Sequence, residues 1–361
     1  MKEMILLTPG PTPLPLAVRE ALGRPILHHR TDEFGRIFRE TLAGLAEVYR
    51  TKNTVLIMTG SGTCAMESAV ANLLSPGDRT LVHSTGAFGE RFAQILKAYG
   101  LPPIVIDEEW GHAADVERLR KALRSEKNLK AVFFQHTDTS TGIVNDLQKL
   151  AAVVREEAPS ALIVVDAVSG LAAEELETDA WGLDVVLSAS QKGLLCPPGL
   201  AYAAVSERAW KAVEAGRLPR FYLDWRTMRR SLEKSETPFT PAISIVVAQA
   251  EALRLIREEG LERVWKRTAE LAEFTRKELV RMGLKLFAAD PADILTAAWL
   301  PAGFDNTLLK KMREEDGICF AGGQEKLAGR VIRVAHMGAI RREDLEAGLK
   351  VLARRLGGVH A

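Results

Sequence analysis

The sequence predicts an α/β protein in three layers, with helices on both faces of a mostly parallel sheet and a smaller α+β domain at the C-terminal end. Short, wholly apolar strands alternate with amphipathic helical segments between residues 53 and 205, a pattern typical of strands buried on both faces. The alternation of strands and helices ends after residue 229, where a charged segment leads into a long helical stretch. The 361 residues, 47% of them hydrophobic, can form about two domains with a large core.

The expected elements follow in chain order. A proline-rich arm at residues 8–15 (TPGPTPLP) comes first, and its prolines disfavour a helix because they lack backbone donors. Strands are expected at 53–58, 80–83, 103–106, 131–135, 161–165, 185–187 and 200–205, the last at the far side of the sheet. Helices are expected at 64–74, 88–99, 116–123 and 147–156.

A long helical stretch at 245–282 leads into a second, smaller unit. Strands at 295–299 and 331–334 and a helix ending near residue 356 complete it. We therefore predict an N-terminal arm at 1–15, a large domain at 16–259 and a small C-terminal domain at 260–361.

Charge and cysteine content argue against several classes of function. The 48 basic and 47 acidic side chains give a net charge of +1, so no overall field attracts nucleic acid or an anionic membrane. Cys64, Cys196 and Cys319 are odd in number and far apart, which favours a reduced, cytoplasmic protein. No C-x-x-C or H-E-x-x-H spacing predicts a metal site, and no apolar stretch reaches the roughly 20 residues of a membrane helix. Small molecules and a second copy of the chain are the expected partners.

Three turns after predicted strands carry residues suited to chemistry, because ligands bind at the carboxyl ends of strands in open parallel sheets. The segment TGSGT at residues 59–63 precedes a helix and suits an anion such as phosphate. Asp166 ends an apolar run, and Lys192 is the only charged residue between Asp184 and Glu207. The alternatives are a tight glycine turn without a ligand, a capping or ion-paired aspartate, and a solvated surface lysine.

A dinucleotide-binding turn made by Gly60, Gly62 and Ala65 is a competing interpretation of the first segment. That motif requires an acidic residue at the end of the next strand to hold the ribose. The next strand instead ends in His83 and Ser84, which counts against this alternative.

An anion site, a buried carboxylate and a desolvated lysine together match the needs of pyridoxal 5'-phosphate. This cofactor requires a cradle for its phosphate, a partner for its pyridinium nitrogen and an amine that forms a Schiff base with its aldehyde. Burial disfavours the ammonium form of Lys192 and so favours the reactive amine. The combination is far more specific than any one of the three features.

Several segments resemble the class V aminotransferases, in particular the alanine:glyoxylate and serine:pyruvate group of fold type I pyridoxal-phosphate enzymes. The resemblance spans nearly the whole chain and keeps the family's order. The segments are LLTPGPTPLP, TGSGTCAMESAVANLLSPGD, HTDTSTGIV, VVDAVSG, SASQKGLLCPPG, FYLD and GRVIRVAHMG. It implies that residues 16–259 form the cofactor-binding domain.

The resemblance also implies roles for single residues. Lys192 would form the Schiff base and Asp166 would pair with the pyridinium nitrogen. The other cofactor contacts would come from Ser61, Gly62, Thr63 and Gln191 at the phosphate, Phe88 stacked on the ring and Thr139 near it. Arg333 would hold the substrate carboxylate, and Gly10 would line the substrate pocket. From the residues alone, Phe88 also fits a core position, Thr139 a turn cap and Arg333 an exposed strand position.

One segment departs from the family pattern. In relatives, the segment matching TPFTPAIS at residues 237–244 reaches the neighbouring subunit and gives its phosphate a tyrosine and a threonine. The segment has no tyrosine here, and Thr240 is the candidate for the threonine. The resemblance thus implies a homodimer with shared active sites.

We therefore expect an aminotransferase that moves an amino group from a small amino acid, alanine or serine, to a small 2-oxo acid, glyoxylate or pyruvate. Aspartate or phosphoserine aminotransferases on the same fold are alternatives. A lyase similar to cysteine desulfurase is another alternative. Such lyases typically carry a histidine before the lysine, where this chain has Gln191.

Overall fold

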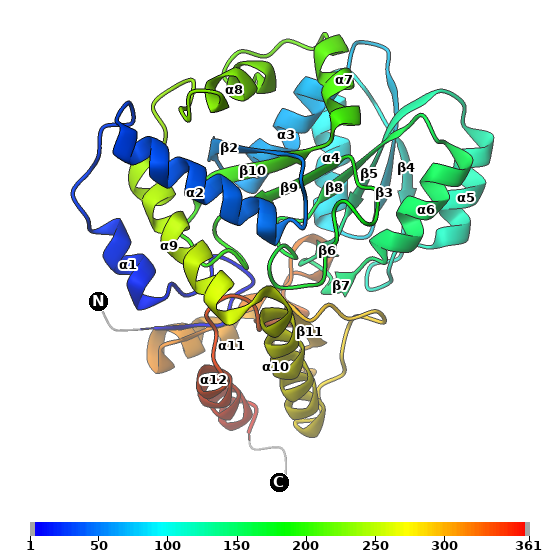
Figure 1. Cartoon of the computed structure of the whole chain (residues 1–361). Coiled ribbons are helices and arrows are strands. Elements are labelled where there is room, and N and C mark those ends of the chain that lie inside the picture. Colours follow the sequence, from blue (N-terminus) through cyan, green and yellow to red (C-terminus); the bar gives the residue numbers. More distant parts are fainter. Residues whose placement is uncertain (1–3, 358–361) are drawn as a thin grey trace.

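Seven strands form the central sheet of the computed structural model, which describes residues 4–357 (Figure 1). Their order is β2-β10-β9-β8-β5-β3-β4, and every neighbouring pair is parallel except the two that include β10. The bounds are β2 Thr54–Gly60, β3 Arg79–Ser84, β4 Ile104–Asp107, β5 Leu129–Gln135, β8 Leu162–Asp166, β9 Val185–Ala189 and β10 Gly199–Val205. The prediction of a mostly parallel sheet is confirmed.

The position predicted for β10 is wrong. This strand does not lie at the far side of the sheet but inside it, antiparallel to β2 on one side and to β9 on the other. All of its residues after Gly199 are buried. An apolar run shows that a strand is buried, but it carries no information about which strands pair with it.

Helices cover both faces of the sheet, as predicted. α3 Gly62–Leu73, α4 Ala87–Ala98, α7 Glu207–Ala215 and α8 Trp225–Leu232 lie on one face, and α1 Leu16–Leu22, α2 Asp32–Val48, α5 Val116–Ser125, α6 Leu147–Glu157 and α9 Ile243–Glu259 lie on the other. β8 separates the two cores, because successive side chains of a strand point to opposite faces. Leu162 and Val164 pack with the first group of helices, and Ile163 and Val165 pack with the second.

The helical stretch predicted at 245–282 consists of two helices, because Gly260 separates α9 from α10 Leu261–Arg281. Gly260 has a φ of +85°, a left-handed conformation that glycine adopts readily. α9 packs on the large sheet, whereas Leu271 and Leu279 of α10 belong to a separate core. The domain boundary predicted at 259/260 falls at this junction and stays a prediction.

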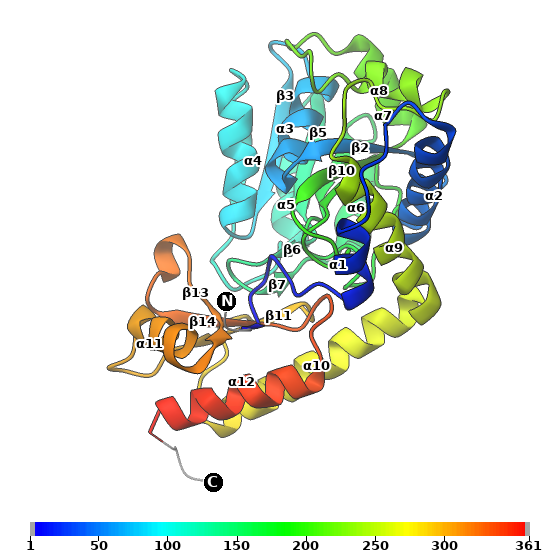
Figure 2. The same ribbon diagram turned by 90° about the vertical axis from the view of Figure 1, so that its left-hand side faces the viewer.

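The C-terminal part has its own antiparallel sheet in the order β11-β14-β13. Its strands are β11 Leu295–Trp299, β13 Ala321–Gly322 and β14 Val331–Ala335, and α12 Arg342–Arg355 runs beside α10 (Figure 2). The remaining elements are α11 Asn306–Lys311, a π-helical turn at Met312–Asp316, a 3-10 turn at Glu325–Leu327, the parallel pair β1 Ile5–Leu6 and β12 Ile318–Cys319, and the hairpin β6 Thr137–Asp138 and β7 Ile143–Val144.

The N-terminal arm runs from the small sheet to the turn after β9. Leu7 N donates to Cys319 O at 2.9 Å, and Leu7 O accepts from Ala335 N at 2.9 Å. Thr12 N donates to Gln191 O at 3.2 Å, and Thr12 Oγ1 donates to Lys192 O at 3.1 Å. The arm therefore connects the C-terminal sheet to the turn after β9 that carries Lys192.

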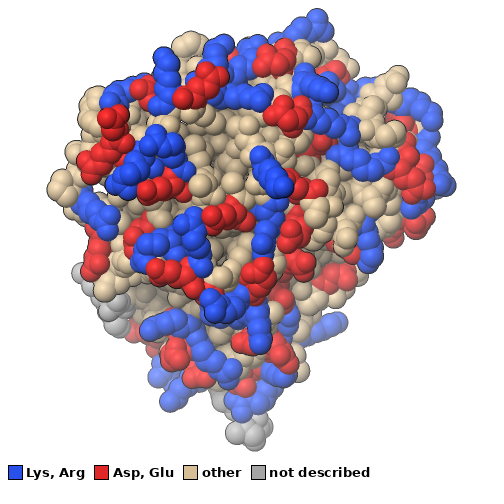
Figure 3. All heavy atoms as spheres, viewed as in Figure 1, with Lys and Arg blue, Asp and Glu red and all other residues tan. Residues whose placement is uncertain are grey.

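The surface carries both signs of charge. Lysine and arginine alternate with aspartate and glutamate over the face shown in Figure 3, in line with the net charge of +1. Among the helices of residues 4–357, none is both long enough and apolar enough to cross a bilayer.

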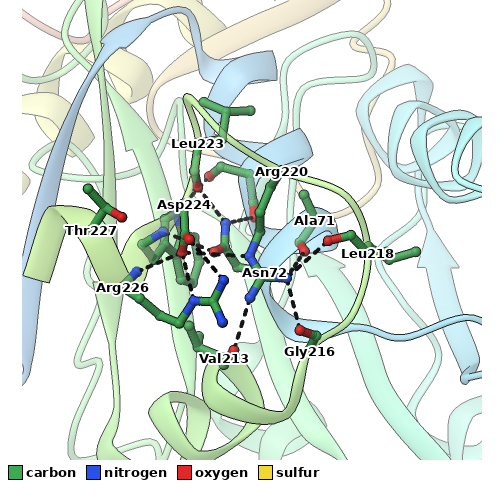
Figure 4. A network of polar contacts seen from close by, with 12 residues as sticks. Ala71, Asn72, Val213, Gly216, Leu218, Arg220, Leu223, Asp224, Arg226 and Thr227 are labelled. Carbon is green, nitrogen blue, oxygen red and sulfur yellow. Dashed lines mark hydrogen bonds and ion pairs between the residues drawn. The ribbon is translucent and has the colours of Figure 1, made fainter. Parts of the chain in front are cut away.

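Arg220 holds the loop between α7 and α8 against the end of α3 (Figure 4). Its side chain is only 3% exposed. Its Nη1 and Nη2 atoms donate, each at 3.1 Å, to the carbonyl oxygens of Ala71, Val213, Gly216 and Leu218. The loop backbone is thus fixed by one buried guanidinium.

We expect Arg220→Met to lower the free energy of unfolding by about 3 kcal/mol or more, because the carbonyls that it binds lose their donor together. Urea denaturation measures this. Arg217→Met is the matched control, since Arg217 is exposed in the same loop, and its effect should stay within about 0.5 kcal/mol. Equal stabilities of the two variants would contradict the assignment.

Candidate active site

The predicted site residues gather at the carboxyl ends of the parallel strands. Ser61 follows β2, Asp166 ends β8 and Lys192 lies in the turn after β9. The charges of Asp166 and Arg333 both shift the pKa of Lys192, so these groups lie within electrostatic range of one another. The structure therefore brings together residues that are far apart in the sequence.

Asp166 is a buried carboxylate, 4% exposed. Its Oδ1 accepts a hydrogen bond from Val168 N at 2.8 Å. Burial raises its pKa to about 6, and the nearby carboxylate of Asp138 acts in the same direction, whereas Arg91 and Lys192 act against it. A cation placed beside Asp166 would restore its charged form.

Lys192 is the half-buried amine of the site. Its Nζ donates to Pro9 O in the N-terminal arm. Burial and the positive charge of Arg333 lower its pKa to about 8, and Asp166 acts in the opposite direction. A substantial fraction of the side chain is therefore a neutral amine near pH 8, the form that reacts with carbonyl compounds.

Gly10 lies directly against Lys192. Its φ is +125°, and a Cβ built at this position would come within 2.5 Å of Cδ, Cε and Nζ of Lys192. Only glycine leaves room for the lysine side chain here.

The first turn of α3 is an uncapped helix N-terminus. Ser61 is its N-cap residue, and its side chain makes no capping hydrogen bond. A Cβ at Gly62 would come within 2.8 Å of Val168 Cγ2, so the backbone of this turn packs closely behind Asp166. Gln191 Oε1 is buried without a hydrogen-bond partner in the described part of the chain. Free N–H groups at a helix N-terminus favour an anion.

Phe88 is held in place through the first turn of α4. Its N–H donates to Asp138 Oδ2 at 3.0 Å, and Ala87 N donates to Ser140 Oγ at 3.0 Å. Ser140 Oγ in turn donates to Asp138 Oδ1 at 2.6 Å. Arg91, one turn further along α4, lies with its guanidinium 4.7 Å from the centre of the Phe88 ring.

Arg333 projects from β14 and is 6% exposed. Its Nη1 donates to Thr139 O at 2.6 Å and its Nε donates to Gly322 O at 2.8 Å. Burial lowers its pKa to about 10, and Asp138 acts against this shift, so the guanidinium stays charged at neutral pH. The Thr139 backbone thus positions Arg333, while a role for the Thr139 hydroxyl stays a prediction.

Thr240 is exposed, and the segment that carries it, residues 237–244, does not join the other predicted site residues. The segment lines a groove together with Ile57, Thr59 and Tyr222. Ala242 N donates to Thr59 Oγ1 at 3.1 Å, which places the segment beside the end of β2. Its predicted contact with a second subunit stays a prediction.

Sequence reasoning missed three polar residues of this site. Asp138 and Ser140 lie within the segment HTDTSTG, and Arg91 lies three residues after Phe88. Two polar residues spaced at i and i+2 after a buried strand were the available signal for a cap, and the i, i+3 spacing of Phe88 and Arg91 was the signal for a shared helix face.

A family model for aminotransferase class-V matches residues 17–342. The chain belongs to this family. Class-V aminotransferases use pyridoxal phosphate as their cofactor. Within residues 4–357, no group of three or more histidine, cysteine, aspartate or glutamate side chains could hold a metal ion.

Similar proteins carry different names. The soluble hydrogenase 42 kDa subunit of Anabaena cylindrica is 39% identical over 98% of this chain and 94% of its own length. The serine–glyoxylate aminotransferase of Methylorubrum extorquens is 33% identical over 92% of this chain and 86% of its own length.

Two solved structures confirm the fold. An aspartate aminotransferase of subgroup IV from Thermus thermophilus superposes with a TM-score of 0.91 and 34% identity, covering 98% of this chain and 99% of its own. An alanine–glyoxylate aminotransferase from Nostoc sp. gives a TM-score of 0.94 and 31% identity, covering 99% and 96%. The enzyme is therefore a class-V aminotransferase.

Ionised Asp166 should destabilise the class-V enzyme when no cation pairs with it. Its pKa is raised to about 6 in the folded state, whereas an unfolded aspartate titrates near about 3.9. The folded protein keeps a proton that the unfolded chain loses between about pH 4 and pH 6, so stability falls as the pH rises through this window.

We expect Asp166→Asn to raise the free energy of unfolding of the cofactor-free enzyme by up to about 3 kcal/mol near pH 7.5, with little effect near pH 4. Urea denaturation at both pH values measures the difference. Asp107→Asn, at the exposed end of β4, is the control and should show no such pH dependence. A lower stability of Asp166→Asn at the higher pH would contradict the prediction.

Proposed function

We propose that this class-V aminotransferase binds pyridoxal phosphate and moves an amino group from a small amino acid, alanine or serine, to a small 2-oxo acid, glyoxylate or pyruvate. The observation that carries the proposal is the buried set of Lys192, Asp166 and Arg333 at one edge of the sheet. Relatives named as serine–glyoxylate and alanine–glyoxylate enzymes support the choice of substrates. Cytoplasmic location stays a prediction.

The residues present fit the cofactor. The uncapped first turn of α3 offers backbone N–H donors at the expected phosphate position, and Gln191 would help through its amide nitrogen, since its amide oxygen can only accept hydrogen bonds. Ser61, Gly62 and Thr63 would hold the phosphate there. Burial disfavours the charged form of Asp166. Its carboxylate would therefore accept a hydrogen bond from the protonated nitrogen of the cofactor ring. When bound, the cofactor supplies an electron sink for the pair released at the substrate Cα.

Lys192 moves the proton in this proposal. With its pKa lowered to about 8, free Nζ accepts the proton from the substrate Cα in the first half-reaction. It would pass that proton to the aldehyde carbon of the cofactor, and in the second half-reaction it would carry a proton from that carbon back to the Cα of the new amino acid. Gly10 and Pro9 of the arm keep this amine in a fixed position between the arm and the strand ends.

Arg333 orients the substrate. Its guanidinium donates hydrogen bonds to the carbonyl oxygens of Thr139 and Gly322. Neither of these partners is charged, so the positive charge can still pair with a substrate carboxylate. A planar guanidinium suits a carboxylate because it can donate two parallel hydrogen bonds. Phe88, fixed by Asp138, would cover the cofactor ring and exclude water from one side.

An exposed aromatic cluster supports a homodimer. Phe221 is 81% exposed, and its ring centre lies 5.8 Å from that of Phe239, which also stacks on Tyr222 at 5.2 Å. Such exposed apolar clusters mark protein interfaces. Because Thr240 follows Phe239 directly, covering this cluster with a second subunit would carry Thr240 toward the phosphate position of that subunit.

The reaction is tested with alanine, serine, aspartate, phosphoserine and cysteine as donors against glyoxylate, pyruvate and 2-oxoglutarate. We expect alanine or serine with glyoxylate or pyruvate to turn over fastest, and Lys192→Ala to lose more than about 100-fold of this rate. Aspartate with 2-oxoglutarate as the best pair would contradict the substrate assignment. Sulfide release from cysteine would favour the lyase alternative, and a colourless protein that stays inactive with added cofactor would contradict the proposal as a whole.

The interface is tested with Phe221→Asp, which places a charge in the aromatic cluster. We expect light scattering to show a monomer and cofactor titration to show weaker binding, since the partner's Thr240 contact is lost with the interface. Val280→Asp is the control, because Val280 is an exposed apolar residue on α10. A Phe221→Asp protein that remains dimeric would contradict this interface.

A further inference from the structure

Arg91 points from α4 toward the first turn of α3. Its Nη1 donates to Thr63 Oγ1 at 3.4 Å, and its guanidinium lies over the Phe88 ring at 4.7 Å. In the part of the chain that the structure describes, Arg91 forms no salt bridge, and its side-chain hydrogen bond goes to Thr63 alone. It is therefore a half-buried cation whose side chain has no carboxylate in direct contact.

The surroundings of Arg91 are already positive. It lies beside a helix N-terminus, which carries a partial positive charge. It also lies within electrostatic range of Lys192, whose pKa its charge lowers, and of Asp166, whose pKa its charge lowers. Asp166 is the one anion of these two groups, and it is already assigned to the nitrogen of the cofactor ring. The N-terminus of α3 and the guanidinium of Arg91 are both positive and meet at Thr63 without an anion between them, so they repel each other.

A group with two negative charges would resolve this repulsion. Phosphate is such a group, and it offers several acceptor oxygens to a guanidinium. We propose that Arg91 is the counter-ion of the cofactor phosphate, acting at the Thr63 side of the α3 turn. This inference rests on the proposed function, since it assigns one more residue to the same site.

The position of Arg91 gives it a second task. In the proposed reaction Lys192 would be released from its covalent link in the first half-reaction and linked again at the end of the second, and between these points only noncovalent contacts with the protein would retain the cofactor. A charge-assisted contact that does not depend on Lys192 would keep its full strength at that stage. Arg91 should therefore matter most for retaining the amino form of the cofactor, which has no covalent link.

The test uses the full-length protein freed of cofactor and compares pyridoxal phosphate, pyridoxamine phosphate and phosphate-free pyridoxal. Binding is followed by fluorescence quenching in wild type, Arg91→Gln, Arg91→Lys and Lys97→Gln. Lys97 is exposed on the same helix, so Lys97→Gln removes the same charge away from the site. Circular dichroism and thermal melting show whether each variant is folded.

We expect Arg91→Gln to weaken both phosphate-bearing compounds by about 10- to 100-fold and to leave pyridoxal unchanged. Arg91→Lys should lie between Arg91→Gln and wild type, and Lys97→Gln should match wild type. Inorganic phosphate should raise the melting temperature of the cofactor-free wild type more than that of Arg91→Gln. This last readout requires neither the cofactor nor turnover.

Three outcomes would overturn the assignment. Equal losses for pyridoxal and its phosphate would mean that Arg91 acts only by supporting the Phe88 ring. Unchanged binding of all three compounds would mean that Arg91 has no part in cofactor binding. Unchanged cofactor binding together with a raised KM for the amino donor, alanine or serine, would place Arg91 at the substrate. If wild type itself binds neither pyridoxal nor its phosphate, the proposed function fails, a result distinct from these three.

Discussion

Burial of ionisable groups at the carboxyl edge of the sheet is the constraint on which the rest of this structure depends. Burying such a group costs free energy unless it forms a hydrogen bond or an ion pair. Many of the hydrogen-bond partners here are backbone atoms. Lys192 is met by Pro9 O, and Arg333 by Thr139 O and Gly322 O. Asp138 accepts from Phe88 N. The arm, the small sheet, the hairpin β6–β7 and helix α4 are therefore held together by the groups that would do the chemistry.

The same constraint explains how much of the site the sequence can reveal. A lone lysine in an apolar segment and a carboxylate at the tip of an apolar strand are visible without a structure, and the structure places them in the turn after β9 and at the end of β8. Asp138, Ser140 and Arg91 were missed because their roles come from contacts between α4, α3 and the loop after β5. Local spacing could have indicated the cap and the shared helix face, but it does not record contacts between separate elements. Thr240 lies outside the cluster of one chain, so a single sequence leaves its role open.

The fold was predictable to a similar degree. Strands buried on both faces were recognised because both faces demand apolar residues, whereas the place of β10 was missed because pairing partners leave no local pattern. A helical stretch was predicted on both sides of Gly260 with a domain boundary near it, but a glycine inside a helix costs only about 1 kcal/mol relative to alanine, so the pattern alone did not show that one helix ends there and another begins. Helices α1 and α2 were missed, although Thr31, Asp32 and Glu33 form a recognisable start of α2.

The arm that covers Lys192 has a consequence for biosynthesis. The bond between Lys192 Nζ and Pro9 O joins residues 183 positions apart, so the arm is synthesised well before its partner and must wait for its place until the turn after β9 has been made. Contacts of such long sequence separation form late, because closing the loop costs entropy before any contact rewards it. A nascent chain would therefore present its reactive amine uncovered, and docking of the arm over Lys192 would be among the last steps of its maturation.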